Sequence, residues 1–263
     1  MLNSFALSQV LAFLTVFLWS TAYVFTRVAL EWFTPGTLGF LRCLAASLCL
    51  LALVAVRRLA PPPLRAVPLF VLSGLTGFTL YILFFNTGSA SLLATTSCVL
   101  ISTSPIITAL LASVLFKERL SATRWAATLL AFGGILVMCL WDADFAVSEG
   151  FFWMLGAALL ISVYNLLQRV LAPRFGALHV TAYSFFFGTL PLFAYAPQAI
   201  GELAAAPAGG VLLVCFLGAF PSAAAYVLWS KALGLAPRTG SVTNYMFLIA
   251  LPFSSSVTPL TSR

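Results

Sequence analysis

Apolar runs long enough to cross a lipid bilayer follow one another along almost the whole of this 263-residue chain. A transmembrane helix needs about 20 apolar residues to cross roughly 30 Å of hydrocarbon, and the turns between these runs are too short to fold by themselves. Only 7% of the residues are charged and the mean hydropathy is +1.09. The sequence therefore predicts an all-α, polytopic membrane helix bundle. The predicted spans are 8–30, 35–56, 66–86, 88–116, 122–141, 150–171, 177–197, 208–231 and 240–260.

Positive charge gathers in every second connection between these predicted spans. The cations of these connections are Arg57, Arg58, Arg65, Lys117, Arg119, Arg124, Arg169, Arg174, Lys231 and Arg238. The other connections hold no cation: they contain the acids Glu31, Asp142, Asp144, Glu149 and Glu202 or, at the turn 86–89, only neutral residues. Because Lys and Arg are enriched in cytoplasmic loops, the alternation predicts a cytoplasmic N-terminus. It also explains the net charge of +7 without a nucleic-acid partner.

A faint internal repeat indicates how the helices are organised. A shift of 142 residues lays Ser20 on Ser162, and a shift of 145 residues lays the segment 80–83 on 225–228. Five predicted spans separate the two copies, so matching helices run in opposite directions through the bilayer. Inverted repeats of this kind are typical of secondary transporters, which bind solutes near the membrane midplane.

Three long runs, 17–51, 92–138 and 223–249, resemble the EamA-type ten-helix branch of the drug/metabolite transporter superfamily. The most specific elements are Trp19-Ser20, Pro35 with Arg42, Ser104-Pro105 followed by Lys117-Glu118-Arg119, and Tyr226 with Trp229 and Ala232. The resemblance implies two inverted five-helix repeats, at 8–141 and 150–263, in a carrier of the bacterial inner membrane with both termini cytoplasmic. Such carriers export amino acids, related metabolites or toxic compounds. The 145-residue shift puts Pro105 opposite Ala250 and Glu118 opposite Arg263, the last residue, so we expect the second repeat to lack its last helix, leaving about nine spans.

Polar or aromatic side chains near the middle of a span are the candidates for a substrate cavity, because polar groups in hydrocarbon need a cavity or a partner. Trp19 and Tyr23 are four residues apart and share a helix face. The candidate substrate-binding residues are Trp19, Ser20, Tyr23, Tyr81, Ser97, Ser104, Tyr164, Asn165, Tyr226, Trp229, Asn244 and Tyr245. The alternative for each is packing: aromatic side chains with a buried polar tip, or hydroxyl and amide groups bonding between helices.

Pro105 predicts a bend in the fourth span, because it removes the hydrogen bond to the carbonyl of Ile101. The freed carbonyl borders a stripe of serines, which is typical either of a substrate path or of tight helix contacts.

Between residues 8 and 56, two arginines lie within predicted spans, and both have two interpretations. Arg42, about seven residues into its span, can attract an anionic group; alternatively, Arg27 and Arg42 satisfy helix ends or pair with Glu31. No Asp or Glu lies inside any predicted span. Since ion-coupled carriers usually bind the coupling ion with a carboxylate, we expect a neutral, partly aromatic cavity and facilitated or weakly coupled export.

Enzyme chemistry is disfavoured by the sequence. There is no H-E-x-x-H or G-x-S-x-G motif, and His179 is the only histidine, so we expect no catalytic residue, metal or cofactor. The predicted function is export of small metabolites, such as amino acids or related amphipathic compounds, by alternating access. The alternatives are a non-transporting or degenerate membrane protein, and a drug or toxic-cation exporter. The expected partners are a small-molecule substrate, the lipid bilayer and a second copy in a homodimer. Small residues such as Gly156 and Gly218 allow close helix approach, either inside the bundle or at the dimer contact.

Overall fold

The computed structural model describes residues 4–116 and 149–235, together with the isolated residues 125, 126, 130, 133, 242 and 245. Within this part of the chain, seven helical segments are long and apolar enough to cross a membrane. They are Ser4–Ala29, Pro35–Arg57, Val67–Ser91, Thr96–Leu115, Glu149–Phe175, Ala177–Ala205 and Ala208–Leu235. Apart from the isolated residues, the predicted spans 122–141 and 240–260 lie outside the described residues.

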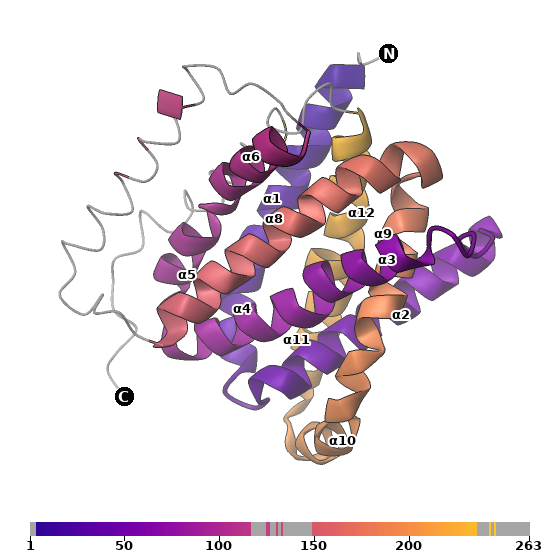
Figure 1. The fold of residues 1–263 in the computed structure, drawn as a ribbon. Coiled ribbons are helices and arrows are strands. Elements are labelled where there is room, and N and C mark those ends of the chain that lie inside the picture. Colours follow the sequence, from indigo (N-terminus) through magenta and orange to yellow (C-terminus); the bar gives the residue numbers. More distant parts are fainter. Residues whose placement is uncertain are drawn as a thin grey trace.

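The helical elements follow one another with short turns (Figure 1). In chain order they are α1 (Ser4–Ala29), α2 (Pro35–Arg57), α3 (Val67–Gly74), η1 (Leu75–Thr79), α4 (Leu80–Ser91), α5 (Ala94–Ile101), α6 (Ser104–Leu115), α8 (Glu149–Phe175), α9 (Ala177–Thr189), η3 (Pro191–Tyr195), α10 (Ala196–Ala205), α11 (Ala208–Leu217), η4 (Gly218–Ala224) and α12 (Ala225–Leu235). Pro35 opens α2, where its fixed φ suits the first helical turn and its missing N–H costs nothing. Gly176, with a positive φ of 84°, separates α8 from α9.

The described part of the bundle has an apolar outside and a partly polar inside. Phe17 and Leu212 expose 61% and 69% of their surface, whereas Asn86, Asn165 and Gln168 are fully buried. A water-soluble protein has the opposite distribution. Lipid solvates the exposed apolar side chains, and the buried polar groups bond to one another inside the bundle.

Two spans contain a π-helical segment, at positions that the internal repeat relates. The segment η1 joins α3 to α4, and η4 joins α11 to α12. A shift of 145 residues carries Leu75–Thr79 onto 220–224, which lies inside η4. Such π-bulges are rare and occur frequently at functional sites.

The helix packing is reciprocal between the two halves of the chain. The first helix of the first half, α1, packs along α12, and the first helix of the second half, α8, packs along α4 (Figure 1). Likewise α2 crosses η4, while α9 crosses α3 and η1. At the last crossing the backbones touch, because a Cβ on Gly188 would lie 2.5 Å from the carbonyl oxygen of Gly74.

The small residues Gly156 and Gly218 serve contacts inside the bundle. A Cβ on Gly156 would meet the ring of Phe84 at 2.5 Å, and one on Gly218 would meet the Cβ of Ala45 at 2.5 Å. Both glycines therefore act in internal packing, and homodimer formation stays a prediction.

The third span is longer than predicted, since the expected turn at 86–89 is helical and α4 continues to Ser91. Two polar contacts explain the difference. The side-chain amide of Asn86 donates to the carbonyl of Pro35 at 3.0 Å, and the guanidinium of Arg27 donates to the carbonyl of Ser89. Contacts from α1 and α2 thus hold these residues in the helix, although the side-chain oxygens of Asn86 and Ser89 have no partner among the described residues.

The fourth span is interrupted just before Pro105. Helix α5 ends at Ile101, a turn follows, and α6 begins at Ser104 with the proline in its first turn. The carbonyl of Thr103 accepts the first amide bond of the new helix, from Ile106 at 3.0 Å. The carbonyl of Ser104, in the first turn of α6, accepts a bond from the hydroxyl of Ser162 in α8 at 2.9 Å.

Candidate functional site

A narrow cavity lies between helices from both halves of the chain. Its walls come from α1, α2, α4 and α5 on one side and from α8 and α12 on the other. The lining residues are Trp19, Ala22, Tyr23, Arg42, Tyr81, Phe85, Ile101, Ile161 and Tyr226. Five of these nine side chains are aromatic, which suits the apolar body of a small amphipathic solute. The space is tight, so a solute as large as an amino acid requires side chains or helices to move as it enters.

Trp19 is held in a fixed orientation at one wall. Its indole Nε1 donates to the carbonyl of Pro221, in η4, at 3.0 Å. Its ring meets Tyr226 edge to face with centroids 5.1 Å apart, and it lies 5.0 Å from the ring of Trp229. Edge-to-face pairs contribute about 0.5–1.5 kcal/mol beyond their area burial, so α1 and α12 are joined by aromatic contacts beside the cavity.

Trp229 and Asn165 lie behind this wall. Trp229 is fully buried, and its Nε1 donates to the side-chain oxygen of Asn165 at 2.9 Å. The amide nitrogen of Asn165 is buried and has no partner among the described residues. The pair therefore links α12 to α8 and supports Trp19 from outside the cavity.

Arg42 brings a positive charge to the cavity. Its side chain is only 4% exposed, and its Nε donates to the hydroxyl of Ser222 at 2.7 Å. The close crossing of α2 and η4 positions the pair, because Gly218, one turn before Ser222, lies against the backbone of α2. Among the described residues, no carboxylate belongs to the cavity lining. The expectation of a neutral cavity is therefore wrong. The sequence shows that Arg42 lies in a span, but whether its side chain points into the cavity depends on tertiary contacts.

Arg27 lies away from the cavity and serves a helix end. Its guanidinium donates to the carbonyls of Ser89 and Leu92, at the C-terminal end of α4. A cation at this end also suits the negative pole of the helix dipole. Of the interpretations considered for the two arginines, the helix-end role holds for Arg27 and the cavity position holds for Arg42.

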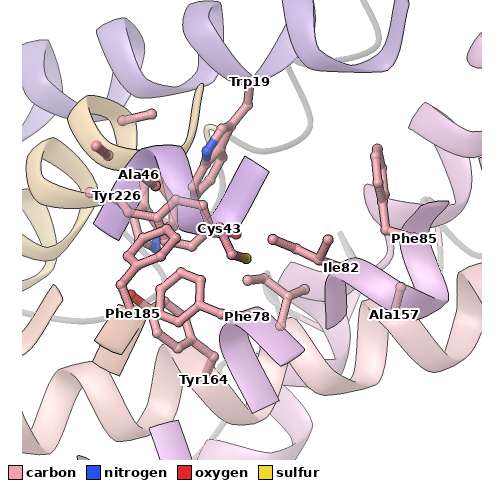
Figure 2. Packing of buried hydrophobic residues seen from close by; sticks show 14 of the residues in the cluster. Trp19, Cys43, Ala46, Phe78, Ile82, Phe85, Ala157, Tyr164, Phe185 and Tyr226 are labelled. Carbon is pink, nitrogen blue, oxygen red and sulfur yellow. The ribbon is translucent and has the colours of Figure 1, made fainter. Parts of the chain in front are cut away.

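An aromatic layer packs around the cavity residue Tyr226 (Figure 2). Phe78 stacks on Phe185 with centroids 3.6 Å apart, and both rings meet Tyr226, at 4.9 and 5.6 Å. Tyr164 completes the layer against Phe78 and Tyr226. These side chains come from four helical segments, η1, α8, α9 and α12, so the layer forms only when these segments are assembled.

A chain of buried polar groups lies beyond the aromatic layer. Gln168 donates to the hydroxyl of Ser73 at 3.2 Å and accepts from that of Ser230 at 2.8 Å. Ser184 donates to Ser73 at 2.9 Å, and Thr181 shares a bond of 2.8 Å with Ser230. All five side chains are fully buried. They connect α3, α8, α9 and α12 about two helical turns along α8 from the cavity residue Ile161.

The comparisons with known proteins agree with this architecture. The chain matches the EamA-like transporter family over residues 6–140 and 148–258. It belongs to that family. The family consists of transporters and not of enzymes, which confirms the prediction that the chain is not an enzyme. The chain is therefore a membrane transporter that contains two EamA repeats.

Relatives of this EamA-like transporter include proteins with and without a named substrate. It is 29% identical, over 87% of its length, to a "Probable terminal-alkyne amino-acid exporter" of Streptantibioticus cattleyicolor, of which it covers 78%. It is 28% identical, over 81% of its length, to the "Uncharacterized transporter YdfC" of Bacillus subtilis, of which it covers 70%. A solved crystal structure matches 96% of this chain and 90% of its own with a TM-score of 0.64. At 19% identity this match shows a shared fold alone.

The sequence-based candidates fall into three groups in this EamA-like transporter. Four line the cavity: Trp19, Tyr23, Tyr81 and Tyr226. The buried or half-buried candidates outside the lining are Ser20, Ser97, Ser104, Tyr164, Asn165, Trp229 and Tyr245. Asn244 lies outside the described residues. Ser20 is occupied within its own helix, since its hydroxyl donates to the carbonyl of Phe17 at 2.7 Å.

Five lining residues were not among the candidates: Ala22, Arg42, Phe85, Ile101 and Ile161. The internal repeat carries a signal for one of them, because Ile161 follows Trp19 by the same 142 residues that separate Ser20 from Ser162. Tyr81 and Tyr226 are related in the same way by 145 residues. Applying the repeat shift to each candidate would have found Ile161. No sequence signal distinguishes the other apolar lining residues, Ala22, Phe85 and Ile101, from apolar residues elsewhere in the spans.

Proposed function

We propose that this chain is a secondary transporter that exports small amphipathic metabolites, amino acids above all, across the bacterial inner membrane. The observation that supports this most is the aromatic cavity shared by both halves of the chain. Trp19 and Tyr81 come from the first half, while Ile161 and Tyr226 come from the second. Secondary transporters bind solute between two repeats, near the bilayer midplane.

The two halves, 8–141 and 150–263, act in this proposal as inverted repeats. Three observations support the relation: reciprocal packing of α1 with α12 and of α8 with α4, a π-helical segment at related positions, and cavity residues that match under the repeat shifts. Helices separated by an odd number of spans run in opposite directions. Rocking of one half against the other opens the cavity to one side of the membrane at a time.

Closed contacts lie on both sides of the cavity. With a cytoplasmic N-terminus, the aromatic layer and the polar chain around Gln168 form the cytoplasmic barrier. On the opposite side Glu202, in α10, accepts bonds from the backbone amide and the hydroxyl of Thr34, at 2.8 and 3.0 Å. Alternating access then consists of breaking one set of contacts while the other is kept.

Amino acids are favoured over cationic drugs by the charge of the cavity. Transport of a permanent cation would require it to lie beside the guanidinium of Arg42, and the lining residues that the structure describes include no carboxylate to offset the repulsion. The aromatic walls provide apolar contact for a side chain. One relative is named a probable amino-acid exporter, which agrees with this choice.

The test is uptake into proteoliposomes, with L-phenylalanine, L-leucine and the lipophilic cation tetraphenylphosphonium as labelled probes. We expect saturable uptake of an amino acid, reduced about tenfold in Trp19→Ala because the ring supplies roughly 1.4 kcal/mol of contact. Phe17→Ala is the matched control, since Phe17 lies in the same helix with 61% of its surface exposed to the outside. Membrane abundance of both variants should equal that of the parent chain.

Three outcomes would contradict the proposal. Saturable uptake of tetraphenylphosphonium alone would favour a drug or cation exporter. Absence of saturable uptake for every probe would favour a non-transporting membrane protein. An equal effect of Trp19→Ala and Phe17→Ala would remove the cavity from the transport path.

A further inference from the structure

We propose that Arg42 binds the carboxylate of the transported solute and that this binding makes the protein an exchanger, with a loaded carrier that reorients faster than the empty one. The inference rests on the proposed transport function and names its substrate class: organic monoanions and zwitterions with a free carboxylate. It starts from a buried charge that the described residues leave without a counterion.

The electrostatic environment of Arg42 is the first step. The guanidinium is almost completely buried, and its one hydrogen bond within the described part of the chain is to a neutral hydroxyl, that of Ser222. Removing an ion from water is costly unless an opposite charge and hydrogen bonds compensate. The described part of the chain supplies the hydrogen bond but not the charge. A bound anion would complete the site.

The geometry of the guanidinium is the second step. An arginine side chain carries one donor on Nε and the rest on its two terminal nitrogens. Ser222 takes Nε, which fixes the plane of the group. The terminal nitrogens have no hydrogen-bond partner among the described residues, and the side chain lines the cavity. A paired fork of donors matches the two oxygens of a carboxylate.

The rest of the lining is the third step. The aromatic residues of the cavity lie on α1, α4 and α12, and Arg42 contributes its charge from α2. A solute with its carboxylate on Arg42 can therefore place an apolar or aromatic side chain against Tyr23, Tyr81 and Tyr226. The lining thus recognises a carboxylate joined to an apolar group and not an apolar group alone.

The consequence for transport follows from the charge balance. In an alternating-access cycle the cavity must pass through a state closed to both sides, where water no longer solvates the guanidinium. An empty carrier reaches this state with an uncompensated cation, whereas a carrier with a bound carboxylate reaches it as a neutral pair. The return of the empty carrier is therefore the slow step. Solute on the far side accelerates the cycle because it neutralises the charge for the return.

Binding to the purified protein in detergent tests the anchor, with four probes that share a phenylethyl group: L-phenylalanine, 3-phenylpropionate, L-phenylalaninamide and 2-phenylethylamine. We expect the two carboxylates to bind at least about tenfold more tightly than the amide and the amine. Arg42→Gln should remove this preference and Arg42→Lys should restore part of it. Arg27→Gln is the matched control, because Arg27 bonds only to backbone carbonyls at the end of α4.

Efflux from proteoliposomes loaded with labelled L-phenylalanine tests the exchange. We expect unlabelled L-phenylalanine outside to accelerate efflux by about tenfold, and Arg42→Gln to abolish the acceleration. Equal efflux with and without external solute in the parent chain would overturn the exchange mechanism.

The outcomes separate this inference from the proposed function. Transport of the amide or the amine, with both carboxylates inert, would overturn the role of Arg42 and leave a transporter. Lack of binding and transport for all four probes would overturn both. If Arg42→Gln fails to fold, the comparison of the four probes in the parent chain still decides whether a carboxylate is required. Ser222→Ala removes the bond that orients Nε, so it should weaken binding of the two carboxylates and leave binding of the amide and the amine unchanged.

Discussion

The polar chain beyond the aromatic layer gives a quantitative prediction through Gln168→Leu. The side-chain amide of Gln168 makes two interhelical bonds, to Ser73 and from Ser230. Leucine has a similar volume, so the substitution removes the bonds and leaves no large hole. Both hydroxyls keep a partner, because Ser73 still bonds to Ser184 and Ser230 still bonds to Thr181. The loss is therefore that of two bonds, without the further penalty of an orphaned buried group.

Interhelical hydrogen bonds in membrane proteins contribute about 0.6 kcal/mol each on average. Two such bonds correspond to about 1.2 kcal/mol, which is roughly an eightfold shift in an opening equilibrium. Hydrogen–deuterium exchange measures this shift. We expect the backbone amides of α9 and α12 that border Gln168 to exchange roughly eightfold faster in Gln168→Leu.

Gln198→Leu provides the matched control. Gln198 is exposed in α10 and bonds to Thr34 and Glu202, on the opposite side of the cavity. Its substitution should leave exchange around Gln168 unchanged. If Gln168→Leu altered exchange by less than about twofold, or altered both sides equally, the polar chain would not be the barrier on this side.

Two further outcomes are expected. Gly188→Ala should lower the thermal unfolding midpoint in detergent by several degrees, because overpacking typically costs about 1–3 kcal/mol. The control Gly201→Ala, with no atom within 4 Å of its new Cβ, should leave the midpoint unchanged. Equal midpoints for the two variants would mean that α3 and α9 can separate without loss of stability. A reporter fused after Arg174 should be cytoplasmic and one fused after Ala206 extracytoplasmic; the reverse result would invert the proposed orientation.

The spans were predictable from the sequence because the bilayer imposes one strong condition. A helix must be apolar over about 20 residues, and this condition does not depend on tertiary contacts. Every described span overlaps a predicted one. The ends were less predictable: the sequence suggested a turn at 86–89, but the amide nitrogen of Asn86 bonds to α2, the backbone carbonyl of Ser89 accepts from Arg27 in α1, and the segment stays helical.

The cavity was predictable where a local rule or the repeat applies. Trp19 and Tyr23 lie on one helix face by their spacing, and Tyr81 and Tyr226 occupy related positions 145 residues apart. Asn165 was also a candidate, but its side-chain oxygen accepts a hydrogen bond from the indole nitrogen of Trp229. Whether such an amide faces a solute or a neighbouring side chain depends on helix rotation, which the apolar pattern of the sequence leaves open.

The two arginines show why the charge of the cavity required the structure. Both lie inside apolar spans of the first half, and by sequence both can reach outward, pair with Glu31 or serve a helix end. Arg27 finds free carbonyls at the end of α4 because α1 packs beside that end. Arg42 lies where α2 crosses η4 at Gly218. Its guanidinium bonds there to the hydroxyl of Ser222 and not to the carbonyls of a helix end. The same π-helical segment thus supplies the carbonyl that holds Trp19 and the hydroxyl that holds Arg42. A shift of η4 against α1 and α2 would therefore change both walls of the cavity together, which couples solute binding to the movement of the second half of the chain.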